Sequence, residues 1–323
     1  MTTYGSTGPT DSLMRAAAIT EFGDADRLQI QRTAVPEPGP DEVLVRVEVA
    51  GVQPTDAAIR RGWAPPGTVI DFPQILGNEF AGTIVKAGNA VEEFSPGDEV
   101  LGFRVLECYA EYVSVPANQV VRKPAEVDWL TAGALSASGQ TAHTALERLD
   151  ARAGETLLVH GAAGGVGTVA VQLARLRGLT VIGTGSLSNQ DYIRSLGAIP
   201  VIYGDGERDR IAAAASTSVD LALDTAGHGN LDIATHLVAN RRRVATITEP
   251  GLANQLGCQW ITSDRSQNRL TELVSLCARD QLRITIRATY PLEHAAQAHR
   301  DVETGHGRGK IALDIRPHNA DQF

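Results

Sequence analysis

The stretch Leu157-Leu-Val-His-Gly-Ala-Ala-Gly-Gly-Val-Gly167 decides the fold, because an apolar strand pattern runs directly into a glycine-rich turn and an apolar-faced helix. Its spacing, Ala162-x-Gly164-x-x-Gly167, is a variant of the dinucleotide-binding fingerprint with alanine in the first place. Glycine lets the backbone approach a pyrophosphate, and the helix N-terminus offers free N–H groups to phosphates. A tight turn that binds nothing is the alternative. If the turn binds a cofactor, four of its residues are expected to contact it: Ala163, Gly164, Gly165 and Val166.

Around this turn, short apolar strand patterns alternate with helix patterns. After the strand that precedes the turn, further strands are predicted at 180–183, 200–203, 219–223 and 243–247, with helices around 166–177, 191–196, 209–215 and 231–238. This alternation is typical of a doubly wound parallel sheet. The sequence therefore predicts an α/β Rossmann nucleotide-binding domain over residues 131–282, entered through a helix at 130–149.

The end of the second strand, Gly183-Thr-Gly-Ser-Leu-Ser-Asn189, favours one cofactor over the other. A carboxylate there would hold a ribose 2′-hydroxyl and repel a 2′-phosphate, but the first acidic residue is Asp191. Small and hydroxyl-bearing side chains leave room for a phosphate, so the segment favours NADPH, although it contains no Arg or Lys. For Tyr203, a half-buried strand position is the alternative to a cofactor contact. The residues expected near the adenosine 2′ position are Gly185, Ser186, Asn189 and Tyr203.

The first 130 residues have a β-rich pattern. Residues 43–49 alternate with a period of two, and further strand patterns at 80–85, 99–103 and 109–115 are separated by Gly/Pro turns. Short strands so spaced indicate a partly open barrel or sandwich. The chain returns to β character at 283–286 and 310–315, so we expect residues 283–323 to complete the domain formed by residues 1–130.

Composition excludes several classes of function. The 323 residues carry a formal charge of −9 without a dense basic block, which is unsuited to nucleic acid or an anionic membrane. No apolar run approaches the roughly 18 residues that would span a bilayer, and the first 15 residues lack the apolar core of a signal peptide. Three widely spaced cysteines cannot form a disulfide framework. We therefore expect a cytoplasmic protein that acts on a small molecule.

The motifs taken together resemble the medium-chain dehydrogenase/reductase superfamily, in its zinc-free quinone oxidoreductase-like branch. The resemblance runs from Arg15 to Ile315 and implies a GroES-like β-barrel catalytic domain plus a Rossmann domain. It also implies cofactor contacts for Thr141 and Lys310. Relatives commonly pair as homodimers through the last strand of the nucleotide sheet, which would be residues 257–262 here. The matching motifs lie at 51–56, 76–82, 97–102, 109–113, 139–142, 159–167, 196–198 and 309–311.

The chain departs from the zinc-dependent members of that superfamily. Their catalytic zinc is held by Cys, His and Cys, whereas Gln53, Asn78 and Ser138 stand at the matching positions. None of these is a usual zinc ligand, and the lobe with four closely spaced cysteines is absent, so we predict no bound metal. The branch also usually has Asn where Gln53 stands, and its pocket pattern differs at Ala58 and at Glu107-Cys108.

Without a metal, the substrate must carry its own electrophile. A quinone or an α,β-unsaturated carbonyl fits, because conjugation spreads the charge that a hydride brings, and Gln53 is the candidate to hydrogen-bond the carbonyl. For Thr141 the alternative is a hydrogen bond to helix backbone. His143, His160, Cys108 and Glu79 are expected to be structural. Two other functions stay open: a dedicated enoyl or enone reductase of a biosynthetic pathway, and a non-catalytic NADPH-binding protein.

Overall fold

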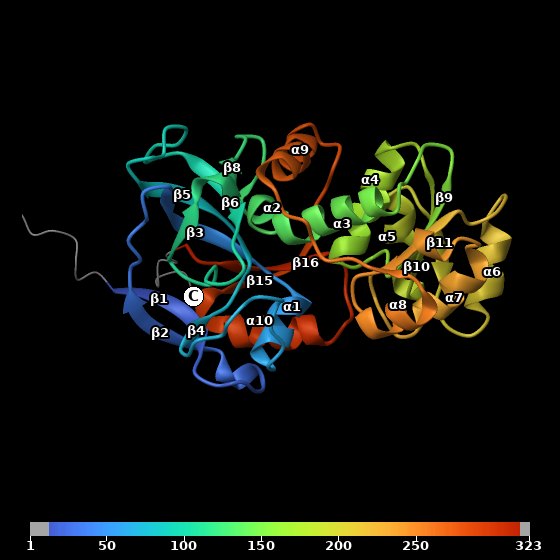
Figure 1. The fold of residues 1–323 in the computed structure, drawn as a ribbon, viewed down its shortest axis with the longest axis horizontal. Helices are drawn as coiled ribbons and strands as arrows, with labels where there is room; N and C mark the ends of the chain where they lie inside the picture. Colours follow the sequence, from blue (N-terminus) through green and yellow to red (C-terminus); the bar gives the residue numbers. More distant parts are fainter. Residues whose placement is uncertain (1–12, 317–323) are drawn as a thin grey trace, which may run out of the picture.

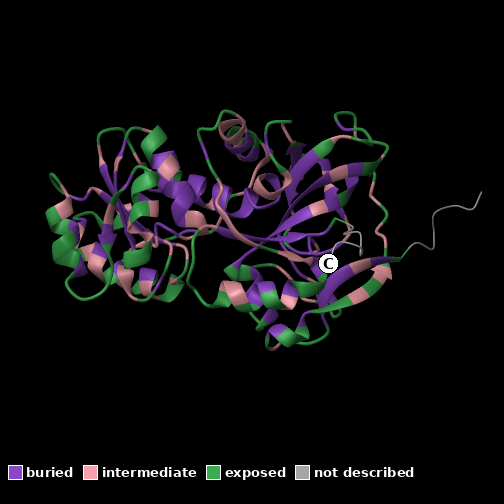
Figure 2. Cartoon of the chain, turned by 180° about the vertical axis from the view of Figure 1, so that it is seen from behind, coloured by how far each residue is buried: buried purple, intermediate pink, exposed green. Residues whose placement is uncertain are grey.

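The computed structural model describes residues 13–316. Two lobes lie side by side in Figure 1, a β-rich lobe that holds both the beginning and the end of the described chain and an α/β lobe built from the middle. Buried residues concentrate in the strands of both lobes, while the outward faces of the helices are exposed (Figure 2). Within residues 13–316, no helix is long and apolar enough to cross a membrane.

The β-rich lobe is built around a seven-stranded sheet in the order β15-β16-β3-β5-β6-β8, with β7 also paired to β3. Two of these strands, β15 (Ile286–Pro291) and β16 (Lys310–Asp314), come from the end of the described chain. A three-stranded sheet, β2-β1-β4, lies against it through a bridge between Ala16 and Ala110. The helix α1 (Pro54–Arg60) follows β3 directly. The strands of this lobe from the first part of the chain are β1 (Leu13–Ile19), β2 (Gln29–Ala34), β3 (Glu42–Val52), β4 (Gln74–Ile75), β5 (Glu79–Ala87), β6 (Glu99–Phe103), β7 (Tyr112–Pro116) and β8 (Val120–Arg122).

The α/β lobe contains a six-stranded parallel sheet in the order β11-β10-β9-β12-β13-β14. The direction in which successive strands are added to this sheet reverses between β9 and β12. Doubly wound folds bind their ligands at such a reversal. Its strands are β9 (Thr156–His160), β10 (Thr180–Gly185), β11 (Ile199–Ile202), β12 (Leu221–Asp224), β13 (Val244–Thr246) and β14 (Gln259–Trp260). Its helices are α4 (Gly165–Leu176), α5 (Gln190–Ser195), α6 (Glu207–Ala214), α7 (Asn230–Leu237) and α8 (Pro250–Leu256).

The last strand of this sheet is shorter than the predicted segment 257–262. Gly257 ends α8 in the left-handed region with φ of 70°, and the Cys258 N–H donates back to Ala253 O at 2.8 Å. These two residues therefore belong to the end of the helix, and the strand is confined to Gln259–Trp260.

The single helix predicted over 130–149 is wrong, because two helices occupy this segment. They are α2 (Trp129–Gly133) and α3 (Ser136–Arg148). The break has a physical reason: the Ala137 N–H, in the first turn of α3, donates to Glu79 Oε2 at 2.6 Å. A helix that continued unbroken through this point would satisfy that N–H internally.

The C-terminal segment returns to the β-rich lobe. It contains α9 (Gln267–Ala278), β15 (Ile286–Pro291), α10 (Ala295–Glu303) and β16 (Lys310–Asp314). β16 pairs antiparallel with β3 and parallel with β15, so neither strand joins the nucleotide sheet. The strand predicted at 283–286 begins only at Ile286, because the Gln172 side chain takes the backbone hydrogen bonds of Arg283 instead. The domain limits 1–130, 131–282 and 283–323 stay a prediction, and residues 1–12 and 317–323 lie outside the described residues.

Candidate active site

The glycine-rich turn has the geometry that close approach of a ligand requires. β9 ends at His160 and α4 begins at Gly165. A Cβ on Gly167 would lie 2.2 Å from Gly161 O, so this glycine allows the helix to pack against the turn. At Gly164 an added Cβ would meet only Gly161 O, at 3.4 Å, so the space beside it is open. The first N–H groups of α4 have no intrahelical acceptor, and together with this open space they fit a pyrophosphate.

A buried carboxylate connects the two lobes beside this turn. Glu79 is fully buried, and its Oε1 accepts a hydrogen bond from Lys310 Nζ at 2.7 Å and another from Gln53 Nε2. Its Oε2 accepts from the Ala137 N–H at the start of α3. A Cβ on Gly51 would lie 2.0 Å from Glu79 Oε1, so a glycine there leaves the space that the carboxylate occupies. Glu79 therefore positions both Gln53 and Lys310.

Lys310 brings this cluster to the glycine-rich turn. A Cβ on Gly165 would lie 2.9 Å from Lys310 Cδ and 2.9 Å from Ser138 Oγ. Ser138 is 1% exposed, and its hydroxyl has no hydrogen-bond partner within residues 13–316. An orphaned buried hydroxyl next to the turn is a group that a bound ligand can satisfy. The structure thus brings Gln53, Lys310 and Gly165 to one place.

A second buried carboxylate, Asp56, lies next to this cluster. It accepts hydrogen bonds from Tyr109 Oη at 2.8 Å, Asn78 Nδ2 at 2.7 Å and the Gln53 N–H at 2.8 Å. Burial raises the pKa of Asp56 to about 6, although the three hydrogen bonds favour its charged form. Tyr109 is buried as well, and its burial and the neighbouring Asp56 charge raise the pKa of its hydroxyl.

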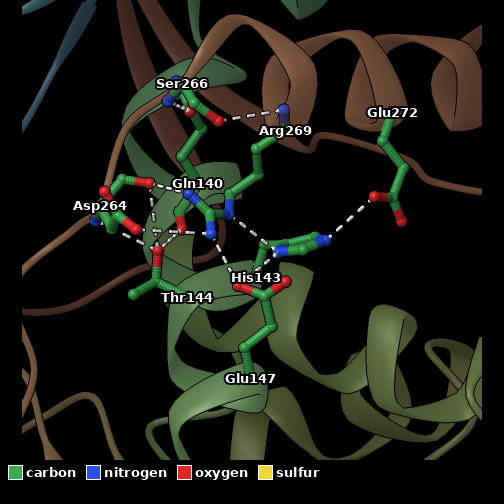
Figure 3. Close-up of polar contacts among 8 residues, drawn as sticks. All are labelled: Gln140, His143, Thr144, Glu147, Asp264, Ser266, Arg269 and Glu272. Carbon is green, nitrogen blue, oxygen red and sulfur yellow. Dashed lines mark hydrogen bonds and ion pairs between the residues drawn. The ribbon is translucent and has the colours of Figure 1, made fainter.

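Arg265 approaches the cluster from the α/β lobe. Its guanidinium donates to Asn78 O at 2.8 Å and to Asn78 Oδ1 at 2.6 Å. The residues on either side of Arg265 are held against α3, as Figure 3 shows. The Ser266 N–H donates to Gln140 Oε1 at 2.7 Å, and the Asp264 N–H donates to Thr144 Oγ1 at 3.2 Å. Gln140 and Thr144 lie one turn apart on the same face of α3, so this face holds the segment that carries Arg265 to the site.

The end of β10 forms the second part of the candidate site. Gly185 ends the strand, and its carbonyl accepts from the Tyr203 N–H at 3.3 Å, so Tyr203 lies beside it with half of its surface exposed. Ser186 Oγ is 3.0 Å from Ser188 Oγ. Asn189 Oδ1 accepts from Arg308 Nε at 2.8 Å. The four residues expected near the adenosine 2′ position therefore gather at one edge of the sheet.

Other residues singled out in the sequence have local partners. The Thr141 hydroxyl donates to Ala137 O at 2.6 Å, the backbone alternative noted above. His143 Nδ1 accepts from Arg269 Nε at 3.0 Å, and its Nε2 is 3.1 Å from Glu272 Oε2 (Figure 3). The fully buried His160 lies 3.2 Å from Glu207. Burial raises the pKa of the Cys108 thiol.

The sequence patterns do not identify three functional candidates, Glu79, Arg265 and Arg308. The sequence predicts a structural role for Glu79, but its carboxylate lies at the centre of the cluster. The position of Glu79 in the motif at 76–82 is the one signal that the sequence offers. Arg265 and Arg308 had no signal, because each lies more than 100 residues from the residue that it contacts.

The side chains at the zinc-ligand positions do not fit zinc. Asn78 donates to Asp56 and accepts from Arg265, and Gln53 donates to Glu79. Zinc prefers thiolate, imidazole and carboxylate ligands, and these positions offer neutral amides and a hydroxyl beside a guanidinium and an ammonium group. No cluster of three or more His, Cys, Asp or Glu residues within 13–316 could hold a metal ion.

Comparison with known proteins agrees with this fold. Two family models match: the alcohol dehydrogenase GroES-like domain over residues 39–125 and zinc-binding dehydrogenase over residues 196–313. The quinone oxidoreductase of Lama guanicoe is 32% identical, over 94% of this chain and 98% of the relative. The Arabidopsis thaliana NADPH-dependent alkenal/one oxidoreductase, chloroplastic, is 28% identical, over 93% of this chain and 79% of the relative. The structure of Escherichia coli quinone oxidoreductase complexed with NADPH has a TM-score of 0.80 at 25% identity, covering 93% of this chain and 99% of that one.

A GroES-like domain combined with a Rossmann domain that carries a glycine-rich turn after its first strand is the architecture of a medium-chain dehydrogenase/reductase. The chain belongs to this superfamily, in its quinone oxidoreductase-like branch. The predicted fold class is confirmed, and the protein is an oxidoreductase of this superfamily.

Proposed function

We propose that the protein is an NADPH-dependent, zinc-independent oxidoreductase that reduces a quinone or an α,β-unsaturated carbonyl. The observation that carries the proposal is the buried cluster of Gln53, Glu79 and Lys310 beside Gly165. It places hydrogen-bond donors, and no zinc-binding donor set, next to the turn that fits the cofactor. The NADPH complex of the Escherichia coli relative and the name of the Arabidopsis relative support the cofactor and the two acceptor classes.

The residues that would hold NADPH are those of the turn and of the end of β10. Ala163, Gly164, Gly165 and Val166 would face the pyrophosphate, and Gly185, Ser186, Asn189 and Tyr203 the adenosine. Thr141 and Lys310 would lie on the nicotinamide side. When bound, NADPH supplies a hydride. The chain's own contribution is to hold the acceptor's carbonyl with the Gln53 amide, which Glu79 keeps in place, while the Lys310 ammonium adds positive charge nearby.

Three further points belong to the proposal. A cytoplasmic, reducing setting is consistent with three cysteines that form no disulfide, Cys108, Cys258 and Cys277. Zinc independence follows from the donor set described above. The proposed assembly is a homodimer formed through β14.

The test is a substrate panel with the purified protein. Quinones, 2-alkenals, cyclic enones and simple alcohols are compared with NADPH and NADH, each with and without a chelator. We expect NADPH oxidation with quinones or enones, no effect of the chelator and no alcohol oxidation, because the latter needs a Lewis acid to lower the alcohol pKa. Turnover with alcohols alone, lost on chelation, would refute the proposal. Binding of NADPH without turnover on any acceptor would favour a non-catalytic binding protein.

Cofactor choice is tested separately with Ser186→Asp. A carboxylate at the end of β10 repels a 2′-phosphate and can hold a 2′-hydroxyl. We expect the ratio of kcat/KM for NADPH to that for NADH to fall in this variant, with the unmodified protein favouring NADPH. Equal efficiency with both cofactors in the unmodified protein would contradict the NADPH assignment.

A further inference from the structure

The loop between α10 and β16 carries an arginine to the end of β10. Arg308 Nε donates to Asn189 Oδ1 at 2.8 Å, and its Nη2 donates to Ser188 O at 2.7 Å. The guanidinium carbon lies 5.4 Å from the centre of the Tyr192 ring. The Tyr192 hydroxyl in turn donates to Thr285 Oγ1 at 2.9 Å. Arg308 is therefore seated beside the segment 183–189, on a ring that is itself held in place.

The backbone next to Arg308 is anchored to the glycine-rich turn. The Gly309 N–H donates to Ala163 O at 2.8 Å, and Gly309 forms a bridge with Gly164. A Cβ on Gly309 would lie 2.0 Å from Thr285 O, so only glycine fits this close approach. The consecutive residues Arg308, Gly309 and Lys310 thus reach the end of β10, the turn and Glu79 respectively.

The charge around Arg308 suits an anion. Residues 183–190 contain no Asp or Glu. The next acid, Asp191, is almost fully exposed and forms an ion pair with Arg194 at 2.5 Å. Only two of the guanidinium N–H groups of Arg308 donate to an acceptor within residues 13–316. The planar fork of an arginine matches the oxygens of a phosphate.

We propose that Arg308 is the residue that determines the preference for a 2′-phosphorylated cofactor, binding the 2′-phosphate together with the Ser186 and Ser188 hydroxyls. The proposal rests on the proposed function. It supplies the cation that the segment 183–189 lacks, from a loop over 100 residues further along the chain. Arg194, the nearest cation in the sequence, forms an exposed ion pair with Asp191, whose carboxylate would repel a phosphate there.

The test uses nucleotide fragments that isolate this phosphate. Binding of 2′,5′-ADP and of 5′-ADP to the full-length protein is measured by calorimetry for the unmodified protein, Arg308→Ala, Arg308→Lys and the control Arg194→Ala. Arg308→Ala should weaken 2′,5′-ADP binding by about 10- to 100-fold, the usual range for hydrogen bonds to a charged group, and leave 5′-ADP binding unchanged. Arg308→Lys should restore part of the affinity, because it keeps the charge without the fork. Arg194→Ala should match the unmodified protein.

Each other outcome overturns the proposal in a distinct way. An equal loss of affinity for both fragments would mean that Arg308 only holds the loop in place. A loss that appears in Arg194→Ala instead would move the contact to α5. If the unmodified protein binds both fragments equally, the NADPH preference falls with this proposal; if it binds neither, the proposed function falls as well. Thermal unfolding of each variant checks that the fold is intact.

Discussion

Lys310 Nζ donates to Glu79 Oε1 at 2.7 Å, and both side chains are almost fully buried, at 3% and 0% exposed. The two residues come from the last strand and the fifth strand of the β-rich lobe, 231 positions apart in the chain. Taking two charges out of water is costly, and their attraction offsets the cost only while both are present. This pair therefore makes the fold depend on residues that also lie at the candidate site.

Lys310→Met should destabilise the protein by about 3–5 kcal/mol, because it leaves the Glu79 carboxylate buried without its counter-ion. Urea unfolding measures the effect. Lys86→Met is the matched control, since Lys86 forms an exposed pair with Glu37, and such pairs contribute about 0–1 kcal/mol. If Lys310→Met and Lys86→Met lower the free energy of unfolding by similar amounts, Lys310 is not the counter-ion that stabilises the buried Glu79 carboxylate. A double variant that also carries Glu79→Leu should lose less than the sum of the single losses.

Asp56 should make the protein less stable as pH rises between about 4 and 6. Burial raises its folded-state pKa to about 6, so in this window the folded state binds more protons than the unfolded state, and stability falls with pH. The free energy of unfolding of the unmodified protein, minus that of Asp56→Asn, should therefore decrease from pH 4 to pH 6 and then level off. A shift of this size corresponds to on the order of 3 kcal/mol. A difference that increases with pH would contradict the raised pKa.

Two glycines of the turn should respond differently to substitution. Gly164→Asp should abolish binding of NADPH with little loss of thermal stability, because the space beside Gly164 is open and the added carboxylate repels phosphate. Gly167→Ala should destabilise the fold by roughly 1–3 kcal/mol, because its Cβ would meet Gly161 O at 2.2 Å. Calorimetric binding and thermal unfolding separate the two effects. If Gly164→Asp still binds NADPH, the turn is not the phosphate site.

The elements around the glycine-rich turn could be predicted from the sequence, because local patterns specify them. The apolar strand, the glycine spacing and the helix pattern around Gly164 are all short-range signals. The structure has a strand, β9, directly before the turn, and α4 lies within one residue of the predicted limits 166–177. The single helix over 130–149 failed because Glu79, more than 50 residues earlier, takes a hydrogen bond from its middle. Arg308 and Arg265 were missed for the same reason: what places them is the closing of the β-rich lobe by β16 and the docking of residues 264–266 on α3.

Gln53→Ala should lower kcat on the preferred acceptor by roughly 10- to 100-fold without abolishing turnover, because it removes one donor from a shared arrangement. Gln53→Asn keeps the amide and should retain more activity. The change should appear in kcat more than in KM, since a donor aimed at the developing charge acts in the transition state. A loss of stability with kcat unchanged would instead show that Gln53 serves only to satisfy Glu79.

We predict that the protein is a homodimer formed through β14. β14 is an edge strand of the six-stranded sheet, and its residue Trp260 is 43% exposed. The Ile261 N–H donates inward to Thr246 O at 2.9 Å. Because N–H groups alternate along a strand, the Trp260 N–H faces the open edge, where a second copy could pair.

Light scattering at micromolar concentration should give twice the chain mass of 34.3 kDa. Trp260→Pro removes that N–H and should yield monomers, whereas Trp260→Ala keeps it and should dimerise more than the proline variant. A monomeric mass for the unmodified protein would refute the dimer, and a dimeric Trp260→Pro would move the interface to another surface.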